Sequence, residues 1–201
     1  MQFIQTIYTI WQREIIRYWR DKTGIVSTFF MPLMFLVIFG ACLNETRATG
    51  NFGVDFTQFM YPGIIAMSIM NIAFFSTIST VWDREFGFLK EIMVAPMSRI
   101  SIVFGKTLSG SIIATIQGVI VLAFFPLVGL HLSVTQVILI ILGMFIIALS
   151  ITSLGIMIAS RMTSFEGFGT INNFLVMPLF FLSGAMYPTD SVPSWLKPMI
   201  Y

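Results

Sequence analysis

The residues best suited to polar chemistry lie between Asp83 and Arg99, in the stretch DREFGFLKEIMVAPMSR. Charged residues are only 10% of the chain, yet both signs are concentrated here between apolar segments. An apolar stripe with the spacing of one helical face runs through the stretch, formed by Trp82, Phe86, Leu89 and Met93. The pattern predicts a short amphipathic helix. A membrane-surface helix explains the stripe alone, whereas a helix that docks onto a partner also explains the mixed charges.

Three residues set the expected shape of this helix. Gly87 lies in its interior, where glycine costs about 1 kcal/mol relative to alanine but lets another backbone approach closely. Pro96 disfavours helical geometry at the residue before it, so the helix is expected to end near Val94. Ser98 is placed to cap the helix that follows.

The chain offers no set of residues for catalysis. Gly105-Lys106-Thr107 resembles the end of a phosphate-binding loop, but that loop needs a glycine five positions earlier, where Ile100 stands. The sequence has no paired carboxylates, no nucleophile–base set and no metal-ligand spacing of His, Cys, Asp and Glu, and His131 stands alone. We therefore expect no enzymatic activity, cofactor or metal on this chain, and we expect any ATP to bind a partner.

The elements that position the charged stretch are apolar. Hydrophobic residues are 57% of the chain and the mean hydropathy is +0.91, far above the range of soluble domains. Stretches without Lys, Arg, Asp or Glu predict five transmembrane helices, at 24–43, 61–81, 108–130, 134–158 and 168–186. Backbone groups in lipid must bond to one another, so these spans should be helices. The expected fold is therefore an all-α, polytopic membrane protein with one transmembrane domain over 1–201.

The first 23 residues predict an amphipathic helix rather than a span. Its apolar side consists of Ile4, Tyr8, Trp11, Ile15 and Trp19. Its polar side consists of Thr6, Thr9, Arg13, Arg17 and Arg20. Such a helix fits the cytoplasmic membrane interface, and packing on a partner protein is the alternative.

Lysine and arginine predict the orientation of the chain. With the amino terminus in the cytoplasm, nine of these residues lie in inside segments, and only Arg47 and Lys197 lie outside. This topology makes 82–106 a cytoplasmic loop and 187–201 an external segment of a cell-membrane protein.

The polar residues inside the predicted spans carry no charge. Candidates for a substrate path are Asn71, Thr115, Gln117, Asn172 and Asn173, although most such residues serve as hydrogen-bonding contacts between helices. Gly110, Ala114 and Gly118 form a small-residue stripe that favours packing within the chain over a dimer contact. Ion-coupled transporters usually hold ionisable groups in the membrane, so energy for transport should come from elsewhere.

Two segments carry a resemblance to a known family. The cytoplasmic stretch resembles the loop of the type-2 permease family of ATP-binding-cassette transporters, through Glu85, Gly87, Glu91, Pro96, Ser98 and Arg99. The segment FLSGAMYPTDSVPSWLKPMIY, from Phe181 to Tyr201, is similar to the family's fifth span and external segment. The family normally has a sixth span after this segment, so the resemblance implies that the sequence lacks the last transmembrane helix.

The resemblance implies the membrane half of an exporter, with two permease copies in a homodimer or heterodimer. Each copy would bind an ATPase subunit that holds ATP and Mg, through a coupling helix in the cytoplasmic loop. The expected docking residues are Asp83, Arg84, Glu85, Gly87, Lys90, Glu91 and Pro96. A membrane scaffold or assembly subunit and an ATP-independent channel or facilitator are the alternatives, and no nucleic acid partner is expected. Drugs, lipids, glycolipids and polysaccharides all stay open as substrates.

Overall fold

The computed structural model describes residues 2–46, 56–87, 98–162 and 164–183, and in these ranges it contains helices and no strand. The helices are α1 (Gln2–Arg20), α2 (Lys22–Thr46), α3 (Phe56–Ser76), α4 (Ile78–Glu85), α6 (Arg99–Leu122), the short 3-10 helix η1 (Phe125–Val128), α7 (Val134–Ala159) and α8 (Phe165–Leu182). The expected all-α fold is confirmed for these residues.

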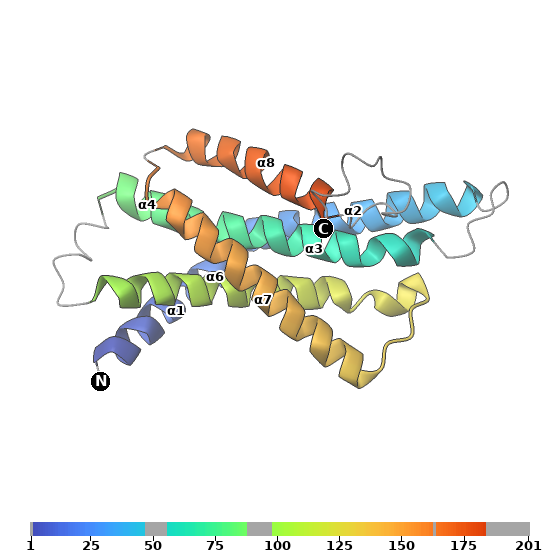
Figure 1. Ribbon diagram of the computed structural model, residues 1–201, viewed down its shortest axis with the longest axis horizontal. Helices are drawn as coiled ribbons and strands as arrows, with labels where there is room; N and C mark the ends of the chain where they lie inside the picture. The colour runs from blue at the N-terminus through green and yellow to red at the C-terminus, as the bar shows by residue number, and fades with distance from the viewer. Residues whose placement is uncertain (1, 47–55, 88–97, 163, 184–201) are drawn as a thin grey trace.

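Helices α3 and α6 form the centre of the bundle (Figure 1). Helix α7 crosses both of them diagonally, while α1 packs against α6. Helices α2 and α8 both pack against α3. The arrangement gives every described element a contact with α3 or α6, so these two helices hold the others in place.

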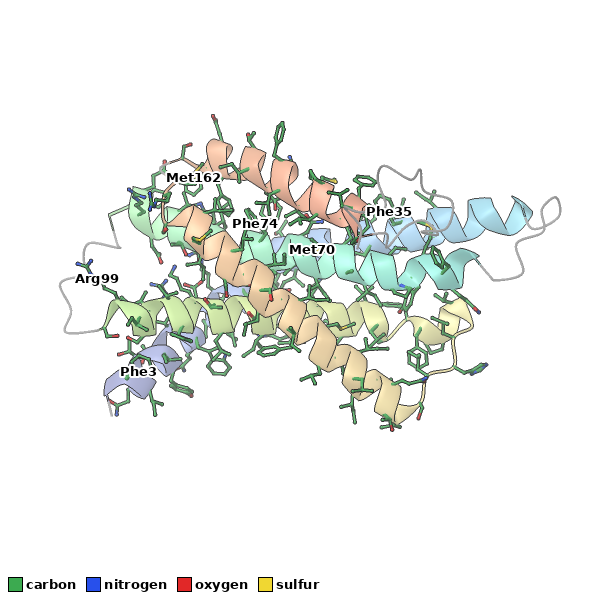
Figure 2. The ribbon with its side chains drawn as sticks, viewed as in Figure 1. Phe3, Phe35, Met70, Phe74, Arg99 and Met162 are labelled. Atoms are coloured by element: carbon green, nitrogen blue, oxygen red, sulfur yellow. The ribbon has the colours of Figure 1, made fainter. Side chains whose placement is uncertain are left out.

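Apolar side chains fill the space between the crossing helices. One cluster joins α3, α6 and α7 through Ile69, Ala114 and Ala148, which are all buried. A second cluster extends from Met70 and Phe74 of α3 toward α7 and α8 (Figure 2). There the ring of Phe74 stacks on that of Phe168 at 4.8 Å.

Small residues allow the helices to approach closely. A methyl group added at Gly110 of α6 would lie 2.7 Å from Thr152 of α7 and even closer to Ser76 of α3. One added at Gly118 would lie 2.8 Å from Ile69. The prediction that this stripe serves packing within the chain is confirmed, because its neighbours are helices of the same molecule.

Four helical segments in the described ranges are long and apolar enough to cross a membrane: Gln58–Glu85, Arg99–Leu122, Val134–Ala159 and Phe165–Leu182. Helix α2 covers the first predicted span, but the structure does not confirm a count of five. Helix α6 begins at Arg99, directly after Ser98 as expected, and it includes Lys106, which is paired inside the helix before the predicted span starts at Leu108. It ends at Leu122 rather than Leu130, and η1 follows it.

Candidate docking surface and cavity

Helix α4 contributes Asp83 to a buried ion cluster, formed by Arg13, Glu14, Asp83 and Lys106. The Lys106 ammonium donates to Asp83 Oδ2 at 2.5 Å, and the Arg13 guanidinium donates to the same oxygen at 2.9 Å. Glu14 pairs with Arg13 at 2.6 Å and lies 3.8 Å from Lys106. The cluster therefore joins α1, α4 and α6 through charge.

The charges of the ion cluster compensate one another. Asp83 and Lys106 are only 6% and 5% exposed, and buried charges are costly unless they are paired. Two cations face two anions, so the cluster carries no net charge. Burial lowers the pKa of Arg13, but the Glu14 and Asp83 carboxylates outweigh this effect, and the pKa is raised overall. Arg13 therefore keeps its charge at any physiological pH.

The two residues that flank Asp83 bind other helices. The Trp82 ring packs edge-on against Phe165 of α8 at 5.7 Å, and the Arg17 guanidinium lies 4.2 Å from the Trp82 ring centroid. Arg84 donates to the carbonyl of Ser160 at 2.6 Å, at the carboxyl end of α7, where a cation is favourable. Three consecutive residues of α4 thus contact α1, α6, α7 and α8.

The end of α4 differs from the sequence prediction. The helix stops at Glu85, and Gly87 has a φ of 76°, a left-handed conformation that commonly ends helices. The prediction of a continuous helix through Gly87 is wrong, because glycine adopts this conformation at no steric cost. Phe86, which the sequence assigned to the apolar stripe beside Trp82, is 78% exposed.

The structure separates the expected docking residues into three groups. Asp83 is buried in the ion cluster, whereas Arg84 and Glu85 are exposed beside Phe86 and Gly87. Lys90, Glu91 and Pro96 lie outside the described residues. Ser98 caps α6 as expected, since its side chain accepts from the Ser101 amide at 3.1 Å. We define Arg84, Glu85, Phe86 and Gly87 as the exposed α4 end.

Helix α1 turns its more polar side toward the protein. Ile10 and Glu14 are buried and face α6, where a methyl group added at Gly105 would lie 3.0 Å from Ile10. Ile4, Tyr8 and Trp19 of the predicted apolar side stay largely exposed. An aromatic, apolar surface on the outside of a membrane protein is suited to contact with lipid.

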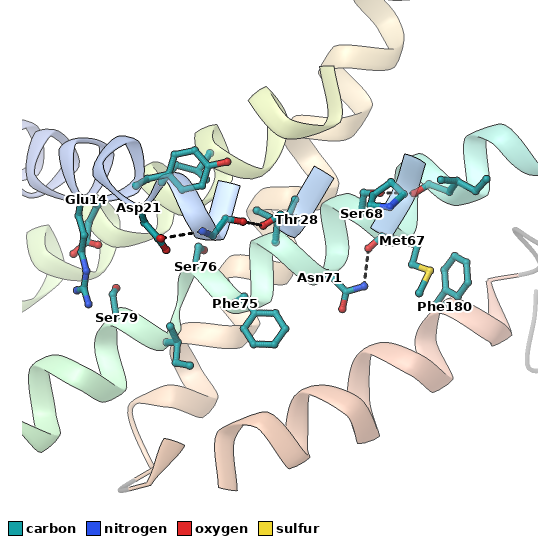
Figure 3. Close-up of a pocket in the computed structure, with 18 of the residues that line it drawn as sticks. Glu14, Asp21, Thr28, Met67, Ser68, Asn71, Phe75, Ser76, Ser79 and Phe180 are labelled. Atoms are coloured by element: carbon teal, nitrogen blue, oxygen red, sulfur yellow. Dashed lines mark hydrogen bonds between the residues drawn. The ribbon is translucent and has the colours of Figure 1, made fainter. Parts of the chain in front are cut away.

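A cavity of about 770 Å³ lies beside α3 and α4 and also touches α1, α2 and α8. Figure 3 shows Glu14, Asp21 and Ser79 at one end and Met67 and Phe180 at the other. Of the five predicted path residues, Asn71 lines this cavity, and its amide nitrogen donates to the Met67 carbonyl at 3.2 Å.

The other four predicted path residues lie away from the cavity lining. Gln117 is fully buried and accepts a hydrogen bond from the Tyr18 hydroxyl at 2.9 Å, which ties α6 to α1. Burial and the nearby Asp21 raise the pKa of Tyr18, so the hydroxyl keeps the proton that it donates. Thr115 donates to a carbonyl of its own helix, Asn172 is buried and Asn173 is exposed. Gln117 therefore fits the alternative reading, a contact between helices.

The sequence reasoning missed the ion cluster. It placed Arg13 on a polar helix face, used Lys106 as the edge of a span and gave Glu14 no role. Only Lys106 itself pointed to the cluster. It directly precedes a long stretch without charged residues, and a lysine that is buried in a helix of that stretch needs a carboxylate partner.

Comparisons with known proteins agree with one another. The family model for the ABC-2 type transporter matches residues 5–201. The relative "Putative transport permease ycf38" of Cyanophora paradoxa is 30% identical over 97% of this chain and 68% of its own length. The chain is also 30% identical to "Probable multidrug ABC transporter permease YbhR" of Escherichia coli, over 73% of this chain and 40% of the relative. "Inner membrane transport permease YadH" of Escherichia coli is 26% identical over 96% and 78%. No solved structure matches significantly.

Proposed function

We propose that this chain, which belongs to the ABC-2 type transporter family, is the permease subunit of an ATP-driven exporter and is moved by a separate ATPase subunit. Membership of the family and the apolar helices make the chain a multi-pass membrane subunit of a transporter. ATP and Mg would bind the partner ATPase, and two permease copies would form the pathway between them. The amino terminus would lie in the cytoplasm of a cell whose cytoplasmic membrane holds the complex.

The observation that supports ATPase docking is the exposed α4 end. An exposed aromatic next to charged residues is the kind of anchor that protein interfaces use, and Phe86 projects from a helix that is tied firmly to the bundle. The docking surface would consist of this end together with Lys90, Glu91 and Pro96. Asp83 would support the surface from within, because its charge is already matched by Lys106 and Arg13.

Co-purification of the complete permease with its ATPase tests the docking proposal. Phe86→Ala and Glu85→Lys should each lower retention of the ATPase about tenfold, as loss of an interface anchor does. Phe174→Ala and His131→Lys are matched controls, because both change exposed residues at other places and should leave retention intact. Equal retention by all four variants would sink the proposal. Retention without ATP-dependent movement of substrate would favour a membrane scaffold instead.

Cysteine labelling tests the proposed orientation separately. With Cys42 replaced by serine, Glu85→Cys and His131→Cys would each place one thiol on an exposed residue. A membrane-impermeant maleimide should label the His131→Cys variant in intact cells, and should label the Glu85→Cys variant only after the membrane is opened. The reverse pattern would invert the topology.

A further inference from the structure

We propose that the cavity beside α3 binds one amphiphilic molecule without net charge, with its head near the ion cluster and its chain toward Phe180. The proposal rests on the proposed function, because it names the class of substrate that such a permease would take. A volume of about 770 Å³ lies within the 300–1,000 Å³ that is usual for small-molecule sites.

The polarity of the cavity changes along its length. Glu14, Asp21 and the hydroxyl of Ser79 line one end (Figure 3), and Arg17, which lies over the Trp82 ring, also lines the cavity. Met67 and Phe180 line the other end (Figure 3), where the Ser68 hydroxyl donates to the Ile64 carbonyl of its own helix at 2.7 Å. A ligand with one polar end and one apolar end matches this order, whereas a purely apolar or a uniformly polar ligand does not.

The length of the cavity fits an extended chain. The lining residues of α3 and α4 recur every three or four positions from Ile64 to Trp82, so they form one stripe along the helix axis. At 1.5 Å per residue this stripe is about 27 Å long, close to the ~30 Å of a hydrocarbon core. Phe75 lies along this stripe with its ring half-exposed, and Asn71 lies near the middle.

Each charged group at the polar end already has a partner within the protein, which argues against a head of one sign. Glu14 is paired with Arg13, and the Arg17 guanidinium lies over Trp82. Asp21 accepts a hydrogen bond from the Gly24 amide at 2.9 Å, at the start of α2. Both signs occur within the lining, so a head with net charge would be repelled by one set of groups as it is attracted by the other.

Photolabelling of the complete permease tests this proposal without its ATPase. The protein is placed in nanodiscs of phosphatidylglycerol, so that the surrounding lipid is anionic. Three single-chain diazirine probes of equal length are compared: one with a phosphocholine head, one with a sulfate head and one without a head. The phosphocholine probe should label cavity residues at least about fivefold more than the other two, and mass spectrometry locates the labels.

Two pairs of variants connect the label to the cavity. Phe75→Ala should reduce labelling by roughly fivefold or more, because the half-exposed ring would no longer cover the chain. Phe174→Ala is its control, since Phe174 is exposed on α8 outside the lining. Asn71→Trp should block the cavity, while Ser150→Trp adds the same side chain on the exposed side of α7.

The outcomes separate this proposal from the proposed function. Equal labelling by the headless probe, or labels spread along α7, would mean ordinary lipid contact and would overturn the proposal. Equal labelling by the sulfate probe would overturn the assignment of a head without net charge. A cavity closed by a helix of a second copy would leave the lining residues unlabelled by all three probes, which also overturns it. If the probes do not label the cavity but ATPase retention depends on Phe86, only the docking proposal stands. If the phosphocholine probe labels the cavity but retention does not depend on Phe86, only the amphiphile site stands.

Discussion

Removal of the Lys106 ammonium is the sharpest test of the ion cluster. Lys106→Met keeps most of the side-chain volume but leaves Asp83, which is 6% exposed, with Arg13 as its remaining partner in the cluster. Loss of one partner from a buried ion pair costs about 3–5 kcal/mol of unfolding free energy, and here two carboxylates would share the single guanidinium of Arg13.

The Arg13→Met variant should be milder. The Arg13 side chain is 33% exposed, and Asp83 would keep the Lys106 ammonium at 2.5 Å. A pair that is partly in water contributes about 1 kcal/mol or less. Charge removal alone therefore predicts a clear order, with Lys106→Met more destabilising than Arg13→Met by at least about 2 kcal/mol.

The double variant Asp83→Leu/Lys106→Met distinguishes lost charge balance from lost packing. It leaves Arg13 paired with Glu14, so the remaining charges still cancel. Replacement of a buried pair by apolar residues is often neutral, so this variant should regain most of the stability that Lys106→Met loses. Lys22→Met is the control, since Lys22 is exposed and should change stability by less than about 0.5 kcal/mol.

Equilibrium unfolding of the complete permease in micelles, followed by tryptophan fluorescence, measures these differences. Trp82 lies next to the ion cluster and reports directly on its surroundings. Similar losses of unfolding free energy in Lys106→Met and Arg13→Met would refute the conclusion that Lys106 is buried and Arg13 is partly exposed. A double variant less stable than Lys106→Met alone would show that the charges stabilise the fold beyond mutual compensation, against the reasoning above.

Three further changes test the packing and the helix ends. Gly110→Ala should lower the unfolding free energy by about 1–3 kcal/mol in the same experiment, because its methyl group would collide with Ser76. Gly143→Ala is the control: its methyl group meets nothing within 4 Å, so it should be neutral or mildly stabilising. Equal effects of the two substitutions would contradict the close helix crossing at Gly110. Ser98→Ala should lower the unfolding free energy by about 1 kcal/mol and speed hydrogen exchange in the first turn of α6, while Ser98→Asp should preserve the cap. Unchanged exchange in Ser98→Ala would exclude the cap. Tyr61→Phe should lower the unfolding free energy by about 1–3 kcal/mol, because the buried hydroxyl donates to two carbonyls at the end of α6. A neutral result would mean that a water molecule takes the place of the hydroxyl in Tyr61→Phe.

The sequence predicted the helices well where one physical rule dominates. Helix α7 begins at Val134, the expected residue, since a long apolar stretch in lipid must satisfy its own backbone groups. The start of α6 was also predicted, from Ser98 as its cap, but the buried role of Lys106 was not. The partners of Lys106, Asp83 and Glu14, are 23 and 92 positions away in the sequence, and no local pattern reveals such a pairing.

The candidate site was only partly predictable for a related reason. Trp82, Asp83 and Arg84 are consecutive in the sequence, but neighbours on a helix point about 100° apart, so they reach different sets of helices. Gly87 was placed inside a helix because the apolar spacing continues past it. Whether glycine continues or ends a helix is decided by differences of about 1 kcal/mol, which a spacing pattern does not resolve.

Helix α4 connects the three features on which the proposals depend. It is about 12 Å long at 1.5 Å per residue, and its far end carries the exposed Phe86. Ser79 and Trp82 of α4 line the polar end of the cavity, while Asp83 holds α4 to α6 and α1. At Thr77, between α3 and α4, the backbone bonds change spacing, since the Thr77 and Thr80 amides donate to carbonyls three residues back. If the proposed ATPase pulled on Phe86, this position is where α4 would tilt against α3. Such a tilt would move the polar end of the cavity together with the ion cluster, while the apolar end on α3 and α8 stays in place.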